Sequence, residues 1–229
     1  TLDLNGKTIE QPTYAMNIDA AVNIKIVDTV GNGVIKTSQS EAGAIAVWTK
    51  EDVNITVDGG TLQGGVSAIF TESNTTVTVT GGTLKGEIFA IKVYGDLTVT
   101  GGSLEGDLYD IQWISGTIDF SANPNPAGIT LAQFLGEDVV LDGTLVKLPD
   151  GYSFYSSKGN EREDEILIET IYNIDQTKYS VTAQDTTNGS FELSTGEGAF
   201  LPGTEVIVTA TPNDGYVVDE ILVNGAAIG

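Results

Sequence analysis

Two acidic residues, Glu87 and Asp107, occupy the same place in two copies of a repeated phrase of the sequence. If neighbouring copies stack in register, equivalent residues lie about 5 Å apart. Two carboxylates at that separation suit a retaining glycosidase, and hard oxygen ligands so placed also suit calcium. Glu105 lies two residues before Asp107 and adds a third carboxylate. These three residues are a candidate calcium site, and solvent-exposed acids on a turn are the simpler interpretation.

Aromatic side chains are the second kind of candidate, because a sugar can stack on a flat apolar ring. Trp48 and Tyr94 are expected to share one column of the repeat, which strand alternation directs outward. Phe89 and Tyr109 share another column, near a bend that leaves their direction open. We take these four as candidate ligand-binding residues, with ordinary packing or partial exposure as the alternative. Trp113 falls on the inward phase.

The composition excludes several classes of function. The sequence has 32 Asp and Glu against 10 Lys and Arg, a net charge of −22, and neither His nor Cys. A chain this acidic has no basic face for nucleic acid. Zinc sites of the usual kind, Ser-His-Asp triads and thiol nucleophiles are also excluded, so calcium is the one cofactor to consider. The charge favours solubility and a monomer, and no apolar run is long enough to span a membrane.

A ten-residue phrase occurs three times and defines the elements that must position these residues. Each copy follows a short alternating strand, as at Ile55–Val57, and equivalent valines are 22 and then 20 residues apart, at positions 57, 79 and 99. One copy cannot bury its apolar side alone, but stacked copies can. The phrase reads Gly60–Ile69, Gly82–Ile91 and Gly102–Ile111 in its three copies.

Stacked copies predict an all-β fold, a right-handed parallel β-helix of about five to six coils over residues 1–120. Antiparallel hairpins are the alternative. A recurring glycine at 64, 86 and 106 marks a bend that would not accept a Cβ. The apolar side chains should form four interior ladders: Leu2, Ile24, Ile55, Val77, Leu97 and Ile118; Leu4, Ile26, Val57, Val79, Val99 and Phe120; Ile9, Leu62, Leu84 and Leu104; and Met16, Ile45, Ile69, Ile91 and Ile111.

The second coil is longer than the others. The spacing from Ile26 to Val57 is 31 residues, so about nine residues are inserted, and Thr37 to Glu41 are expected among them.

The rest of the chain should cap the β-helix and then form a second, smaller β domain. Residues 121–178 are expected to be a capping segment and linker, with a short helix over Thr130–Leu135 whose N-cap is Thr130. The acidic run Glu161–Glu165 is expected to be a solvated connector. Residues 179–229 contain short strands and Gly turns, with seven acids and no base, and are expected to be a truncated β module.

Two resemblances follow from these motifs. Leu2–Ile9, the Gly-Gly-Thr-Leu coils and Leu148–Tyr155 resemble the pectate-lyase-like β-helix region of large secreted proteins from gut and other Gram-positive bacteria. Gly198–Tyr216, continuing to Asn224 and Gly225, resembles the divergent internalin-type B repeat, although the Met-Pro-containing strand that normally closes that repeat is missing. The resemblances imply an extracellular, secreted or cell-wall-attached protein, an adhesin or carbohydrate-binding module. They transfer no functional residue.

The leading hypothesis is therefore a non-catalytic surface protein whose partner is a glycan or a host surface protein. A polysaccharide lyase or glycoside hydrolase of the β-helix type is the second hypothesis, and a purely structural stalk is the third. Related lyases use a basic residue as the proton abstractor, and the only arginine, Arg162, lies outside the coils.

Overall fold

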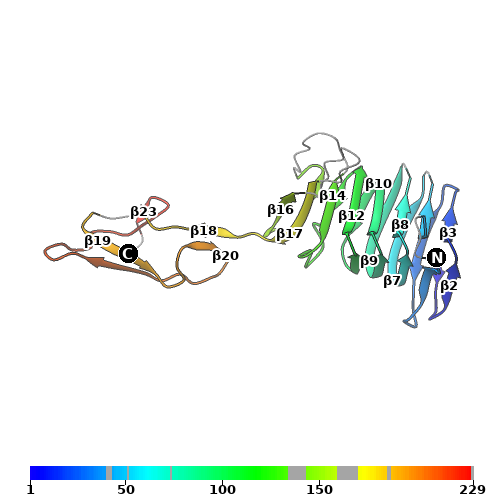
Figure 1. Cartoon of the computed structure of the whole chain (residues 1–229), viewed down its shortest axis with the longest axis horizontal. Helices are drawn as coiled ribbons and strands as arrows, with labels where there is room; N and C mark the ends of the chain where they lie inside the picture. The colour runs from blue at the N-terminus through cyan, green and yellow to red at the C-terminus, as the bar shows by residue number, and fades with distance from the viewer. Residues whose placement is uncertain are drawn as a thin grey trace. The chain divides into compact units, whose positions relative to one another are not determined.

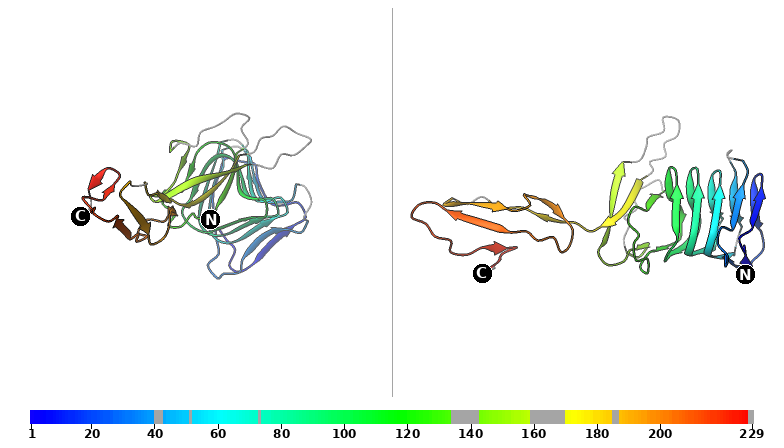
Figure 2. Two further views of the ribbon diagram at one scale, coloured as in Figure 1. Left: turned by 60° about the vertical axis from the view of Figure 1, so that its left-hand side comes forward. Right: turned by 90° about the horizontal axis from the view of Figure 1, so that it is seen from below.

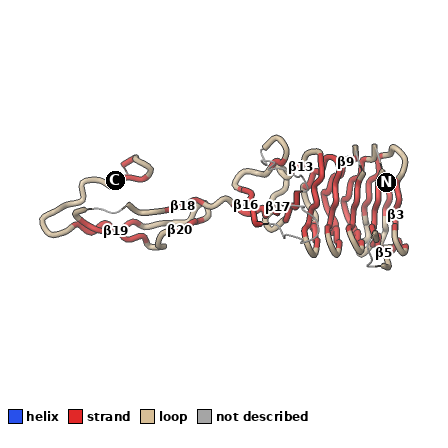
Figure 3. The backbone as a smooth tube through the Cα atoms, turned by 45° about the horizontal axis from the view of Figure 1, so that its top comes forward, coloured by secondary structure: helices blue, strands red, loops and turns tan. Residues whose placement is uncertain are grey.

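Strands are the only regular elements in the described part of the chain (Figure 3). The computed structural model describes residues 1–39, 43–50, 52–72, 74–133, 143–158, 170–184 and 187–227. Among these residues, no helix is long and apolar enough to cross a membrane. The chain forms two compact units, residues 1–175 and residues 176–229, which are described separately.

The first unit is a β-solenoid whose coils contribute strand segments to three parallel stacks (Figures 1 and 2). The first stack contains β1 (Leu2–Asp3), β4 (Asn23–Val27), the first halves of β7 (Asn54–Gly64) and β9 (Thr75–Gly86), the second half of β10 (Phe89–Val99), β13 (Ile118–Asp119) and β15 (Val146–Lys147). The second contains β2 (Thr8–Gln11), β5 (Val34–Thr37), the second halves of β7 and β9, and β11 (Ser103–Gly106). The third contains β3 (Tyr14–Ile18), β6 (Ile45–Thr49), β8 (Ser67–Thr71), the first half of β10, β12 (Tyr109–Ser115) and β14 (Thr130–Gln133).

This arrangement of about six coils, with small separate sheets near the C-terminus, confirms the predicted fold class. Alternate apolar residues point inward and meet their equivalents on the next coil. In the first stack Ile55, Val77 and Leu97 are paired in register and are at most 1% exposed. Because each such side chain has a partner above and below it, the core is a set of continuous aliphatic ladders.

Three predicted ladders contain errors of register near the N-terminus. Leu2 pairs with Ile26 rather than aligning with Ile24, so Leu4 is not the equivalent of Ile26. In the third stack Met16 pairs with Val47, and the predicted Ile45 instead pairs with Tyr14. The predicted ladder of Ile9, Leu62, Leu84 and Leu104 is confirmed and gains Ile35, which is fully buried.

The lengths of the first two coils explain these errors. Leu2 to Ile9 spans seven residues, two more than the equivalent Val57 to Leu62, which displaces Leu2 and Leu4 from their predicted ladders. The long second coil displaces Ile45. Ile26 to Ile35 spans nine residues, whereas Val57 to the equivalent Leu62 spans five, so four extra residues lie between β4 and β5. Ile35 to Val47 spans twelve, whereas Leu62 to Ile69 spans seven, so five more lie between β5 and β6. The insertion has the predicted size, but it is divided between two loops.

The predicted helix over Thr130–Leu135 is wrong where the structure describes it. Thr130–Gln133 is strand β14, which continues the third stack, and Leu131 pairs with Ile111. The Thr130 hydroxyl does not cap a helix. It accepts the backbone N–H of Asp110 at 2.8 Å and donates to the Asp110 carboxylate at 2.9 Å. The exposed edge of β12 offers a template that overrides weak local propensity. Residues 134 and 135, like Glu161–Glu165, lie outside the described residues.

The end of the third stack is covered by an antiparallel strand. β17 (Thr170–Gln176) pairs with β14, with Leu131 opposite Tyr172. Ile174 of β17 is fully buried and belongs to the main core, and the Phe154 ring of β16 (Tyr152–Lys158) lies edge-on to Tyr172 at 5.9 Å. The change of strand direction ends the parallel stack while satisfying its backbone groups.

In its described residues the second unit has three antiparallel strand pairs: β18 (Tyr179–Val181) with β20 (Gly198–Phe200), β19 (Gly189–Leu193) with β21 (Val208–Pro212), and β22 (Leu222–Val223) with β23 (Ala226–Ala227). No described side chain from residue 176 to residue 227 is fully buried.

The corner between the second and third stacks requires glycine, as the sequence predicted. A Cβ on Gly86 would collide with the carbonyl oxygen of Phe89, and Gly64 and Gly106 face the same collision with Ser67 and Tyr109. We expect Gly86→Ala to lower the free energy of unfolding by about 1–3 kcal/mol, since a rigid backbone atom must move. Urea unfolding followed by the fluorescence of buried Trp113 measures this.

Gly143→Ala is the matched control, because no atom lies within 4 Å of a Cβ at Gly143. Equal unfolding midpoints for the two variants would contradict the steric explanation.

One carboxylate ties the first two coils together. Asp28 lies in the loop between β4 and β5 and accepts the backbone N–H of Gly33 at 2.6 Å and that of Gly6 at 2.7 Å. The Gly33 and then the Gly6 N–H groups hold the pKa of Asp28 below its ordinary value of 3.8. A carboxylate with a lowered pKa stabilises the fold above its unfolded pKa, and this contribution is lost as the pH falls through the folded value.

We therefore expect Asp28→Asn to lower the urea midpoint at pH 7, and this difference from the wild type to shrink below about pH 4. Asp150→Asn makes the same change of charge on an exposed turn and serves as the control. If the urea midpoint of Asp28→Asn stayed below that of the wild type by the same amount at acidic pH, the cause of the difference would not be ionisation.

Candidate functional site

The outward face of the third stack carries a column of large side chains. Trp48 of β6 pairs with Phe70 of β8, which pairs with Lys92 of β10. Tyr94 follows two residues after Lys92, so it too points outward. Together with Tyr14 of β3, these side chains form what we call the aromatic strip: Tyr14, Trp48, Phe70, Lys92 and Tyr94.

The prediction that Trp48 and Tyr94 occupy one column is wrong. The strand pairing aligns Trp48 with Phe70 and, through Phe70, with Lys92. The displacement of two residues comes from the same misassignment that placed Ile45 in the core ladder instead of Val47.

Rings of the aromatic strip pack against one another in two tilted pairs. The Tyr14 and Trp48 ring centroids are 4.9 Å apart, and those of Phe70 and Tyr94 are 6.1 Å apart. Lys92 Nζ lies 5.1 Å from the Phe70 centroid and 5.8 Å from that of Tyr94. Such contacts stabilise adjacent coils, and they leave less ring surface for a ligand at Trp48 and Phe70.

Lys92 differs from the lysines that lie in surface ion pairs. Lys25, Lys36, Lys50, Lys85 and Lys147 each lie within 4 Å of a carboxylate, whereas Lys92 has no such partner among the described residues. Partial burial beside two rings lowers the pKa of Lys92 from its usual value. Its ammonium group is therefore held by ring faces rather than by a counter-charge.

A cleft of about 300 Å³ lies beside Tyr94, at the corner between the third and first stacks. Tyr94 pairs with Ser115 on the next coil, across a shift of register between Val93 and Tyr94. Ser115 and the following Gly116 are both small, so small residues border the Tyr94 ring on this side. We call this space the Tyr94 cleft, and its lining residues are Asn74, Thr75, Thr76, Tyr94, Gly95, Asp96, Ser115 and Gly116.

The polar groups of the Tyr94 cleft centre on one carboxylate. Asp96 Oδ1 accepts the backbone N–H and the hydroxyl of Thr117, both at 2.8 Å, which fixes the side chain. Within the described part of the chain, Asp96 Oδ2 accepts no hydrogen bond, and the side chain is exposed. The cleft thus joins an aromatic ring to a fixed acceptor and to the amide and hydroxyl groups of Asn74 and Ser115.

The other aromatic candidates lie elsewhere. Phe89 and Tyr109 stack on each other at 6.1 Å and are only 9% and 3% exposed. They form a small cluster with Ala132, separate from the main core, and present little ring surface to a ligand. Trp113 lies in the main core, as its phase predicted, and donates its ring N–H to the carbonyl of Ser115 at 3.0 Å.

Glu87 and Asp107 follow the paired Gly86 and Gly106 on neighbouring coils, and both side chains are exposed. Glu105 is already bonded to Lys85, at 2.9 Å, and this contact lowers the pKa of Glu105 and raises that of Lys85. Among the described residues, no group of three or more His, Cys, Asp or Glu side chains is placed to hold a metal ion. Of the three candidate metal ligands, Glu87 and Asp107 therefore have carboxylates that are not bound to Lys85.

Sequence reasoning missed most of the cleft. Asn74, Asp96 and Ser115 come from three different coils and carry no motif. Phe70 could have been found, since it occupies the Trp48 column once the third stack is aligned on Val47 rather than Ile45.

Calcium at Glu87 and Asp107 remains a prediction, and the geometry limits its strength. Two exposed carboxylates supply few of the six to eight oxygens that calcium prefers, so we expect a Kd no tighter than about 1 mM. Calorimetric titration of the wild type and Glu87→Gln measures it. A micromolar site that is lost in Glu87→Gln would contradict this expectation.

Comparison with known proteins identifies one region of the chain. Neither the curated proteins nor the solved structures give a significant match. Residues 179–224 match the family model of the divergent InlB B-repeat domain, which confirms the resemblance predicted for this region. Domains of this family occur in bacterial surface proteins, which is compatible with an extracellular location. The second unit of the chain is therefore similar to a B-repeat module of bacterial surface proteins.

Proposed function

We propose that the chain is a non-catalytic, carbohydrate-binding part of an extracellular bacterial surface protein, and that the sugar binds in the Tyr94 cleft. The observation that carries this proposal is the cleft itself. It combines an aromatic ring, a fixed carboxylate and neutral polar groups in about 300 Å³ on a rigid solenoid.

The chemistry of a pyranose matches this set of groups. Its C–H face packs on the side of the Tyr94 ring that borders Ser115 and Gly116, where no ring follows on the next coil. One of its hydroxyl groups donates to Asp96 Oδ2, which then forms a charge-assisted hydrogen bond. Thr117 already holds the other carboxylate oxygen, so little side-chain entropy is lost on binding.

The same geometry favours binding over cleavage. Glycoside hydrolysis uses two carboxyl groups on opposite sides of the scissile bond. Among the described residues that line the cleft, Asp96 is the only acid. A host surface protein as the partner and a purely structural stalk remain the alternatives, and each predicts a different result below.

A glycan array with calcium and with a chelator tests the proposal. We expect reproducible binding without cleavage, and an affinity about tenfold lower in Tyr94→Ala, since losing one ring contact of this kind costs about 1.4 kcal/mol. Asp96→Asn retains one oxygen to accept from Thr117 but replaces Oδ2 by an NH2 group and removes the charge, so it should also weaken binding.

Tyr14→Ala is the matched control, because Tyr14 belongs to the aromatic strip but does not line the cleft. Equal losses in Tyr14→Ala and Tyr94→Ala would move the site away from the cleft. An absence of binding to every glycan on the array would favour a protein partner or a structural stalk. Cleavage products that disappear in Glu87→Gln would overturn the non-catalytic assignment.

A further inference from the structure

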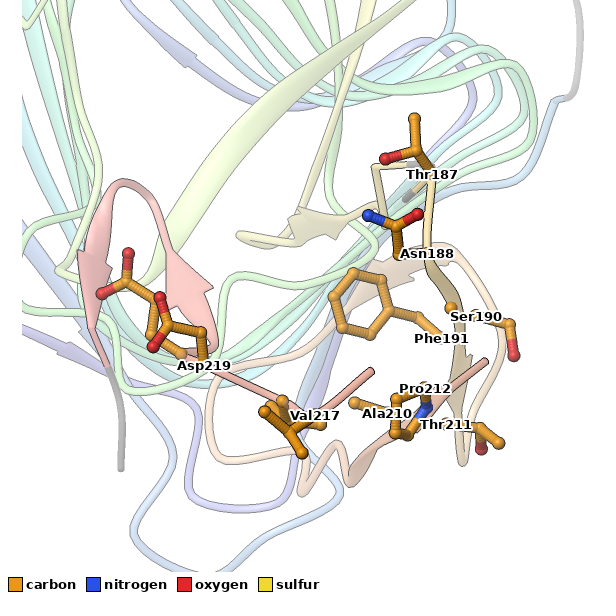
Figure 4. A pocket seen from close by; sticks show the side chains of 12 residues that line it. Thr187, Asn188, Ser190, Phe191, Ala210, Thr211, Pro212, Val217 and Asp219 are labelled. Atoms are coloured by element: carbon orange, nitrogen blue, oxygen red, sulfur yellow. The ribbon is translucent and has the colours of Figure 1, made fainter. Parts of the chain in front are cut away.

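The second unit contains a groove of about 230 Å³ on the face of the β19–β21 ribbon. One wall is the ribbon itself, where Phe191 pairs with Ala210. The other wall is the segment 217–220, which approaches the same face (Figure 4). Figure 4 shows the Phe191 ring directed toward the space that Val217 and Asp219 also border.

The apolar side chains that these walls turn toward the groove, which we call its apolar floor, are unusually exposed. Phe191 is 36%, Val217 85% and Val218 47% accessible to solvent. Since no described side chain of this unit is fully buried, these residues are not simply the margin of a core. Clustered apolar side chains that remain open to water gain free energy when another surface covers them.

The rim of the groove carries negative charge. Asp219 and Glu220 line it, both are exposed, and neither makes an ion pair among the described residues. The whole of 179–229 contains seven acidic residues and no Lys or Arg. A second copy of this unit would bring like charges together. The negative electrostatic potential therefore disfavours self-association and favours a positively charged partner.

We infer that this groove binds an extended peptide segment of a basic partner, in which an apolar side chain lies next to Lys or Arg. The apolar side chain packs between Phe191 and Val217. The basic side chain reaches Asp219 and Glu220, while its methylene groups lie along Val218. This inference is independent of the carbohydrate site, which lies in the other unit.

Peptide binding to the whole chain, followed by NMR chemical shifts, tests the inference. The probe is a short blocked peptide of alternating valine and arginine. The comparison peptides replace valine by serine or arginine by glutamate. We expect the valine–arginine peptide to shift resonances of Phe191, Ala210 and Val217 and to bind more tightly than either comparison peptide.

Two variants separate the contribution of charge to binding from that of apolar contact. The double variant Asp219→Asn/Glu220→Gln should weaken binding at least about threefold, and the loss should diminish in high salt. Val217→Ser should weaken binding without unfolding the unit, because Val217 is largely exposed. Glu192→Gln/Glu205→Gln changes the charge of the unit equally at positions that do not line the groove.

Some results would overturn the inference. Equal losses in the two charge variants would show that the peptide binds only to the diffuse negative field. Equal affinity of the serine–arginine peptide would show that the apolar floor takes no part. Concentration-dependent shifts of the same residues without peptide would assign the groove to a second copy of the chain.

Discussion

The parallel register between successive coils is the constraint on which the solenoid depends. Each strand pairs with its equivalent about twenty residues later, so a side chain repeats its direction on every coil. The same translation produces the aliphatic ladders inside, the glycine corner at Gly64, Gly86 and Gly106, and the aromatic strip outside. A single residue out of step would exchange the inner and outer faces, so residues that fix the path of the chain between strands, such as Asp28 and the corner glycines, are expected to help hold the register.

The candidate site arises where this regularity is interrupted. The register shifts between Val93 and Tyr94, so that the residue opposite Tyr94 on the next coil is the small Ser115. The result is a cleft lined by residues of three coils but supported by their continuous ladders. Rigid strands on either side hold Tyr94 and Asp96 in place, so the solenoid supplies preorganisation while its local irregularity supplies the space.

Prediction from the sequence succeeded where the coils are regular and failed where the regular repeat is interrupted. The three regular copies gave the fold class, the ladder through Leu62, Leu84 and Leu104, and the inward position of Trp113. Spacing alone gave the size of the insertion in the second coil but not its division between two loops, so the positions of Ile45 and Trp48 were misassigned. β14 was mistaken for a helix because its strand depends on pairing with β12, not on local propensity. The cleft had no motif, since strand pairing alone brings Asn74, Asp96 and Ser115 together.

The two units favour different kinds of recognition because they bury side chains differently. In the solenoid, apolar residues have partners above and below, and the Tyr94 cleft is lined by one ring and by polar or small residues. In the B-repeat-like unit each sheet has two strands, no described side chain is fully buried, and Phe191, Val217 and Val218 face solvent beside unpaired carboxylates. A sugar needs a fixed polar site and little apolar area, whereas covering an apolar floor within a negative field requires a partner with both apolar and basic groups. The physical chemistry of the two surfaces therefore suits different kinds of ligand.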